Sequence, residues 1–105
     1  MQILSIHTSS RCTDGAVVLE YALSEPVDGE FISILNDFGE LHSRKLGAIQ
    51  MFTFHADEWL CMKGLSGDSL LYVTHQKRDR ERAENLIEKI LTRYIAIRKN
   101  TADIS

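Results

Sequence analysis

Apolar side chains recur at intervals of three and four residues over the last quarter of the chain, residues 79–99. The repeated positions are Ala83, Leu86, Ile87, Ile90, Leu91, Tyr94 and Ile95. This spacing keeps them on one face of an amphipathic helix. Asp79 suits the N-cap position, and Asn100 can adopt the left-handed conformation that ends many helices. A helix of about 20 residues is about 30 Å long, which is enough to cross a small sheet.

The residues before this helix alternate between short apolar runs and turn residues, a pattern typical of β-strands. Strands are predicted over residues 3–8, 16–23, 31–35, 40–45, 49–55, 59–62 and 69–74. The dense apolar run 31–35 is predicted to be a strand that can lie in the centre of the sheet, and the polar run 40–45 to be an edge strand. Residues 56–58 are predicted to form a tight turn, whereas a bulge there would merge two of the seven strands and leave six.

The two patterns together predict an α+β fold. We expect an antiparallel meander sheet of six or seven strands, which can curl into a half-barrel, packed by one long C-terminal helix. The 105 residues fit a single domain, and only one proline and six glycines are present, so no flexible linker divides the chain. The domain is expected to cover residues 1–100, followed by a short flexible tail at 101–105.

The composition contains no sign of a membrane span or a leader. No stretch of the sequence approaches the roughly 20 apolar residues that a spanning helix requires, and the first residues lack a signal sequence. A cytoplasmic location is therefore expected, in which Cys12 and Cys61 are free thiols.

Charge divides the chain into an acidic body and a basic helix. Residues 1–76 contain four basic and ten acidic residues, whereas residues 77–99 contain eight basic and four acidic ones. At about 100° per residue, four cations fall on one flank of the helix, here called the basic flank. Its members are Arg78, Arg82, Lys89 and Arg93. The flank is either a binding strip for an acidic protein, a phosphoinositide or nucleic acid, or a solvated edge whose arginine stems cover the sheet. The opposite charges of body and helix also suit self-association.

His55 precedes Asp57 and Glu58, which places an imidazole and two carboxylates close together in the sequence. Such groups can bind a metal or transfer protons. The sequence has no second group of ligands and none of the usual zinc spacings, so polar residues beside a hairpin turn are the simpler interpretation. We expect no metal and no cofactor. A small hydrolase-type enzyme that uses His55 with Asp57 or Glu58 remains an alternative.

Residues 8–13, TSSRCT, form a polar loop with one guanidinium group and one thiol. Backbone N–H groups and Arg11 could hold a phosphate there, although the spacing of a P-loop or a cysteine phosphatase loop is absent. A plain hairpin loop is the other interpretation. Nucleic acid is not an expected partner, because the aromatic residues do not alternate with basic residues as an RNA-stacking sheet requires.

Two families share parts of this pattern. The segment LLYVTHQKRDRERAENLIEKILTRYI, residues 70–95, resembles the final strand and capping helix of PH-like domains, which have seven antiparallel strands and one C-terminal helix. FISILNDFGEL, DEWLCMKG and DSLLYVT, followed by the helix, resemble the hairpin and later strands of longin or roadblock-type domains. Longin and roadblock-type domains have a long helix after their first hairpin, where this chain has only LGA, residues 46–48. PH-like domains can bind phosphoinositides through their first hairpin loop, where this chain has Arg11 as its one basic residue. Both families are mainly interaction scaffolds, so either resemblance implies an interaction role.

The leading expectation is a small cytoplasmic, non-enzymatic protein-interaction module, a scaffold or adaptor, that binds a protein partner or a second copy of itself. The basic flank and the polar edge strand are the surfaces that favour this role. The alternative is a small-ligand or anion-binding domain. An apolar cavity lined by Tyr21, Phe52, Phe54 and Met62 would support that alternative, and a tightly filled interior would argue against it.

Overall fold

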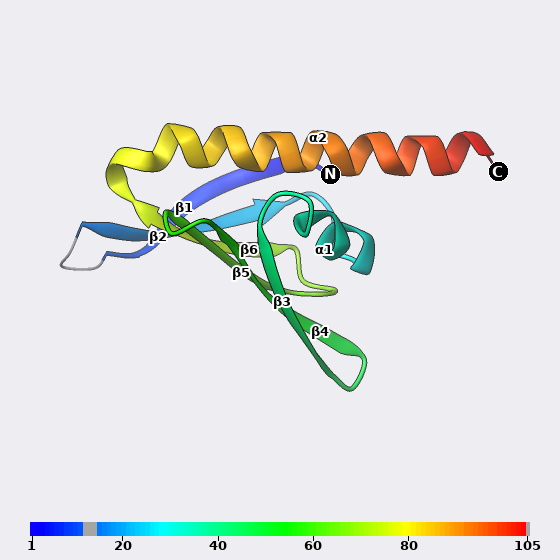
Figure 1. Ribbon diagram of the computed structural model, residues 1–105, viewed down its shortest axis with the longest axis horizontal. Helices are drawn as coiled ribbons and strands as arrows, with labels where there is room; N and C mark the ends of the chain where they lie inside the picture. The colour runs from blue at the N-terminus through cyan, green and yellow to red at the C-terminus, as the bar shows by residue number, and fades with distance from the viewer. Residues whose placement is uncertain (12–14, 105) are drawn as a thin grey trace.

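The computed structural model describes residues 1–11 and 15–104, and the side chains of residues 1–9 and 15–99. The elements are β1 (Ile3–Arg11), β2 (Ala16–Leu23), α1 (Gly29–Leu35), β3 (Glu40–Leu46), β4 (Ile49–Ala56), β5 (Leu60–Leu65), β6 (Leu70–Gln76), the 3-10 turn η1 (Lys77–Asp79) and α2 (Arg80–Ile104). The six strands form one open antiparallel sheet, with α2 lying along it (Figure 1). This confirms the predicted α+β fold. None of the described helices is long and apolar enough to cross a membrane.

The order of strands in the sheet is β1-β2-β6-β5-β4-β3. β1 and β2 form a hairpin, and β3 to β6 form a meander in which each strand pairs with the next. The two halves join where β2 pairs with β6. The connection through α1 therefore carries the chain from β2 to the opposite edge of the sheet, so that β3 is an edge strand, as its polar sequence predicts.

The prediction of a strand at residues 31–35 is wrong, because these residues belong to α1. Asp28 is the N-cap residue, and its Oδ1 accepts a hydrogen bond from the Phe31 N–H at 2.8 Å. The buried side chains Phe31, Ile32, Ile34 and Leu35 follow a helical spacing and face the core. The sheet consequently has six strands, although the turn at residues 56–58 forms as predicted, with Asp57 at a positive φ of 50°.

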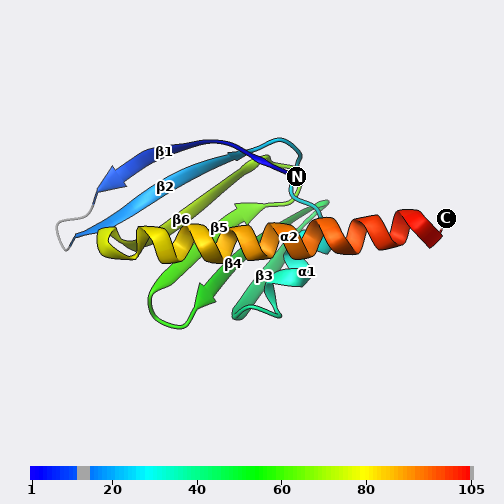
Figure 2. The ribbon, with the colours of Figure 1, turned by 90° about the horizontal axis from the view of Figure 1, so that it is seen from above.

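Both helices cover the same face of the sheet (Figure 2). The helix α2 buries Ala83, Ile87, Ile90, Leu91 and Tyr94, most of its predicted apolar stripe, against alternate residues of the strands. Ile95 is an exception, with 45% of its surface exposed. The helix continues to Ile104, beyond the expected end at Lys99, because no glycine or proline interrupts it. The core therefore lies between the sheet and the two helices.

Candidate interaction surface

The face of the sheet opposite the helices, here called the open face, is not covered by any described element. Strand register places a row of partners across it, from His42 through Thr53, Lys63 and Tyr72 to Glu20. The neighbouring row contains Arg44, Met51 and Leu65, at the end of the sheet near the β3–β4 hairpin. That hairpin projects away from α2 (Figure 1).

Large apolar side chains are exposed on this part of the open face. Met51 is 42% exposed, Leu65 is 36% exposed and Tyr72 is 37% exposed. Leu46 and Ile49 extend the apolar surface to the hairpin tip, at 54% and 47% exposure. Scattered apolar residues are normal on a protein surface, but a contiguous group of them indicates an interaction site.

A groove of about 520 Å³ runs through this region, here called the open-face groove. Its apolar lining includes Met51, Leu65 and Tyr72, and its charged and titratable lining consists of His42, Arg44, Lys63 and Asp68. Two fixed cations and one carboxylate thus surround an apolar floor. The groove suits a ligand that combines apolar side chains with negative charge.

One thiol, Cys61, lies half-buried on the open face, where it pairs across the strands with His55 and Thr74. Burial raises the pKa of the Cys61 thiol, and the charge of Lys63 only partly offsets this effect. The group is therefore a protonated thiol at neutral pH, which is a poor nucleophile.

The basic flank is divided among different surroundings. The Arg82 guanidinium carbon lies 4.1 Å from the centroid of the Trp59 ring, and Arg93 Nη2 lies 3.3 Å from Asp37 Oδ2. Arg78 and Lys89 are exposed, with no ion pair among the described residues. Arg82 and Arg93 thus contact the rest of the domain, whereas Arg78 and Lys89 point to solvent.

The other predicted site residues are spread over the molecule. His55 is half-buried in β4, with its ring 6.4 Å from the ring of His42, whereas Asp57 and Glu58 are exposed in the turn after β4. The described residues contain no cluster of three side chains able to hold a metal ion. Arg11 ends β1, but its side chain and Cys12 lie outside the described residues, so the predicted phosphate loop is not described.

His75 is a buried polar residue that the sequence did not single out. It is 2% exposed, and its Nδ1 donates to the backbone carbonyl of Gln76 at 2.7 Å, which leaves Nε2 without a hydrogen-bond partner among the described residues. A cavity of about 190 Å³ at the start of α2 is lined by His75, Lys77 and Arg80 together with Val17 and Leu19. By contrast, the four side chains whose lining of an apolar cavity would have supported the small-ligand alternative are at most 3% exposed and belong to the core: Tyr21, Phe52, Phe54 and Met62.

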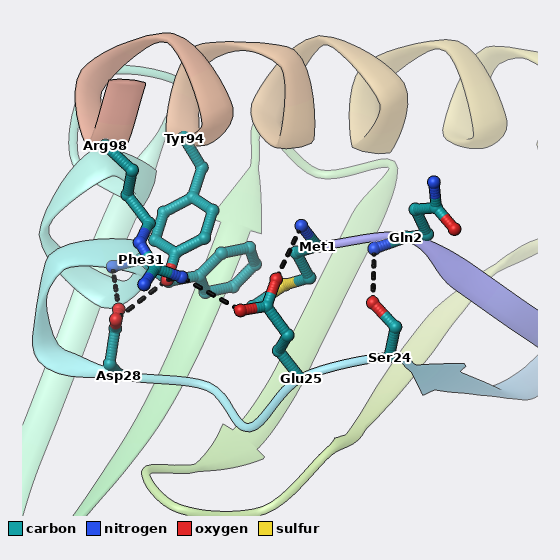
Figure 3. A network of polar contacts seen from close by, with 8 residues as sticks. All are labelled: Met1, Gln2, Ser24, Glu25, Asp28, Phe31, Tyr94 and Arg98. Atoms are coloured by element: carbon teal, nitrogen blue, oxygen red, sulfur yellow. Dashed lines mark hydrogen bonds and ion pairs between the residues drawn. The ribbon is translucent and has the colours of Figure 1, made fainter. Parts of the chain in front are cut away.

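A polar network joins the N-terminus, the β2–α1 connection and α2 (Figure 3). The Met1 ammonium and Arg98 Nη1 contact the two carboxylate oxygens of Glu25 at 2.7 Å and 3.0 Å. The Tyr94 hydroxyl accepts a hydrogen bond from Arg98 Nη1 at 3.1 Å and donates one to Asp28 Oδ2 at 2.7 Å. Because Asp28 also caps α1, this network fixes α1 against α2.

The network shifts the ionisation of its members. The hydrogen bond from the N-terminal ammonium, followed by that from Arg98, lowers the pKa of Glu25. Burial, followed by the hydrogen bond to Asp28, raises the pKa of Tyr94 to about 12. Both shifts favour the charge states that the observed contacts require, so the network is a structural element of the fold.

Comparisons with family models, with curated proteins and with solved structures found no match to this chain. The arrangement of six strands, with α1 between β2 and β3, also departs from the seven-strand pattern that the PH-like resemblance implies. Function therefore has to be inferred from the surface itself.

Proposed function

We propose that this protein is a small cytoplasmic, non-enzymatic protein-interaction module that binds a partner segment in the open-face groove. The observation that carries the proposal is the group of exposed apolar side chains Met51, Leu65 and Tyr72 on an uncovered sheet face. Burying such side chains in a complex contributes roughly 25 cal/mol per Å² of apolar surface, which is the main driving force of most protein association.

The charges of the groove define the chemistry of the partner. Arg44 and Lys63 provide two cations against the single carboxylate of Asp68. A partner segment with apolar anchors and neighbouring acidic side chains would match both properties. The protonated state of the Cys61 thiol favours binding over covalent chemistry on this face.

Affinity capture with matched variants tests this proposal. Leu65→Glu places a negative charge in the groove, and Ile95→Glu makes the same change at an exposed position on α2. A partner captured by the wild type should lose at least about tenfold in affinity with Leu65→Glu, measured by titration calorimetry with the purified partner, and keep its affinity with Ile95→Glu. Equal binding by wild type and Leu65→Glu would contradict the proposal.

A second candidate function, binding of a small anion, is favoured by the cavity beside Lys77 and Arg80. Inorganic phosphate and acetate are suitable probes. Addition of either at millimolar concentration should shift the NMR signals of residues around His75, and Lys77→Glu should abolish the shifts. Unchanged spectra for both anions would exclude this function at the cavity.

A further inference from the structure

The sheet has two edges, and they differ in regularity. β1 forms one edge, and its register against β2 shifts twice, between Ile3 and Ser5 and between Thr8 and Ser10. Such irregularities are a common means of preventing an edge strand from pairing with another chain. β3 forms the other edge, and its register with β4 is unbroken from the pair Glu40–His55 to the pair Leu46–Ile49. β3 also contains no proline. The regular edge is therefore the one available for pairing.

β3 is the last strand in the sheet order, next to β4 alone among the described strands, and its side chains are exposed over almost its whole length. Glu40, His42 and Arg44 alternate along the strand on the open face, because they share that face with their partners His55, Thr53 and Met51. Negative charge thus stands at one end of this row and positive charge at the other. A row of this kind complements itself when two copies run antiparallel.

Geometry restricts the register of such a pair. Two copies that pair as antiparallel edge strands are related by a two-fold axis perpendicular to the sheet, so directly opposed residues must come from the same face. With His42 opposite His42 of the second copy, Glu40 lies opposite Arg44 in both directions. A shift by one pair in either direction places Glu40 opposite His42, or His42 opposite Arg44. Among these registers, only the central one therefore places the Glu40 carboxylate opposite the permanently charged Arg44 guanidinium, and it does so twice.

We propose that two copies of this chain associate through β3 in this central register and form one continuous twelve-stranded sheet from the two six-stranded ones. Within one copy, Glu40 Oε1 lies 2.9 Å from His42 Nε2. In the dimer, the Glu40 carboxylate would therefore contact both His42 of its own strand and Arg44 of the second copy. The inference rests on the proposed function in one respect: the two open faces become continuous, so the dimer offers two adjacent grooves to a partner.

The expected association is weak, because pairing of two edge strands buries less surface than a standard interface. We expect a dissociation constant in the range of about 1–100 μM. Adjacent grooves would still raise the apparent affinity for a bivalent partner, because the second binding event becomes intramolecular.

Charge exchange within β3 tests the proposal by sedimentation equilibrium over a series of protein concentrations. In the dimer, Arg44→Glu turns both Glu40–Arg44 pairs into pairs of carboxylates. Glu40→Arg turns both into pairs of guanidinium groups. Each single variant should weaken dimerisation at least about tenfold, since each changes two opposed pairs. The double variant Glu40→Arg with Arg44→Glu restores opposite charges and should return to within about threefold of the wild type.

Lys45→Glu is the matched control, because it makes the same change of charge as Arg44→Glu but on the other face of β3. In the central register, residue 45 lies opposite Gly39 of the second copy, which has no side chain to pair with. It should leave dimerisation nearly unchanged. All four variants change exposed residues, and circular dichroism verifies that each is folded. A monomeric wild type, an equal effect of Lys45→Glu, or failure of the double variant to recover would overturn the proposal. A monomeric wild type that still binds its partner through Leu65 would overturn the dimer and leave the proposed function intact.

Discussion

Replacement of Asp28 by alanine should destabilise the domain more than a typical change at a partly exposed loop residue. One carboxylate oxygen caps α1 through the Phe31 N–H at 2.8 Å, and the other accepts the Tyr94 hydroxyl proton at 2.7 Å. Asp28→Ala removes both contacts. The buried Tyr94 hydroxyl then keeps only the bond that it accepts from Arg98 and has no acceptor for its own proton.

The magnitude follows from the two contacts. Loss of an N-cap costs about 1 kcal/mol. Loss of a hydrogen bond to a charged group costs about 1.5–3 kcal/mol, because a buried donor is left without a partner. The free energy of unfolding should therefore fall by about 2.5–4 kcal/mol, a large share of the 5–15 kcal/mol typical of a domain. In urea, the unfolding midpoint should fall by about 1–2 M.

A double-mutant cycle separates the two contacts. Tyr94→Phe should cost about 1–2 kcal/mol in the wild type and much less in the Asp28→Ala background, where its acceptor is already absent. Urea unfolding followed by circular dichroism measures all four states. Tyr72→Phe is the control, because Tyr72 is 37% exposed on the open face, and its effect should stay within about 0.5 kcal/mol. If the effects of Asp28→Ala and Tyr94→Phe simply add, the bond between them does not stabilise the fold and the reasoning fails.

Three further predictions concern packing and pH. Gly64→Ala should lower the free energy of unfolding in urea by about 1–3 kcal/mol, because a Cβ there would lie 2.8 Å from the Phe52 ring. Gly29→Ala is the control: a Cβ there has open space around it, and the free energy of unfolding should change by less than about 0.5 kcal/mol. The N-terminal ammonium lowers the pKa of Glu25. The ionised Glu25 carboxylate therefore stabilises the fold above its unfolded-state pKa, and this stabilisation is lost as pH falls through its folded-state pKa. The difference in the free energy of unfolding between the wild type and Glu25→Gln, measured by urea unfolding, should disappear in acid. Burial raises the pKa of Tyr94 from 10.0 to about 12, so its stabilisation should be complete below pH 10 and be lost towards pH 12, and the alkaline unfolding of Tyr94→Phe should lack this loss.

The long helix and the antiparallel sheet were predictable because their patterns repeat over many residues. The run 31–35 was not, since FISIL contains aromatic and β-branched residues that favour strands, and five residues are too few to distinguish a period of two from one of 3.6. The sequence did contain a signal for the helix. Asp28 stands three residues before Phe31, the spacing at which a capping carboxylate reaches a backbone N–H.

The open-face groove was beyond prediction for a different reason. Met51, Leu65 and Tyr72 have the same apolar character as their buried neighbours, such as Phe52 and Val73. Which of the two faces is exposed depends on where the helices pack, and this is a property of the tertiary structure. The basic flank could be predicted as a group of cations on one side of the helix, but the partner of each cation could not, since the contact of the exposed Arg82 with the Trp59 ring depends on how α2 packs on the sheet.

The helix α1 also determines which strand is available to a partner. If residues 31–35 had been a strand in a simple meander, each strand would follow its predecessor in the sheet, and the last strand would lie at an edge. Instead, α1 carries the chain across the sheet, and β6 pairs with β2 on one side and β5 on the other. The apolar strand β6, with Leu71 and Val73 fully buried, is thus protected in the interior of the sheet, and the polar strand β3 takes the edge. Charged side chains on an edge strand discourage aggregation of the free protein. They also restrict pairing to a strand with complementary charges. The short helix therefore replaces an aggregation-prone edge with one that is suited to selective association.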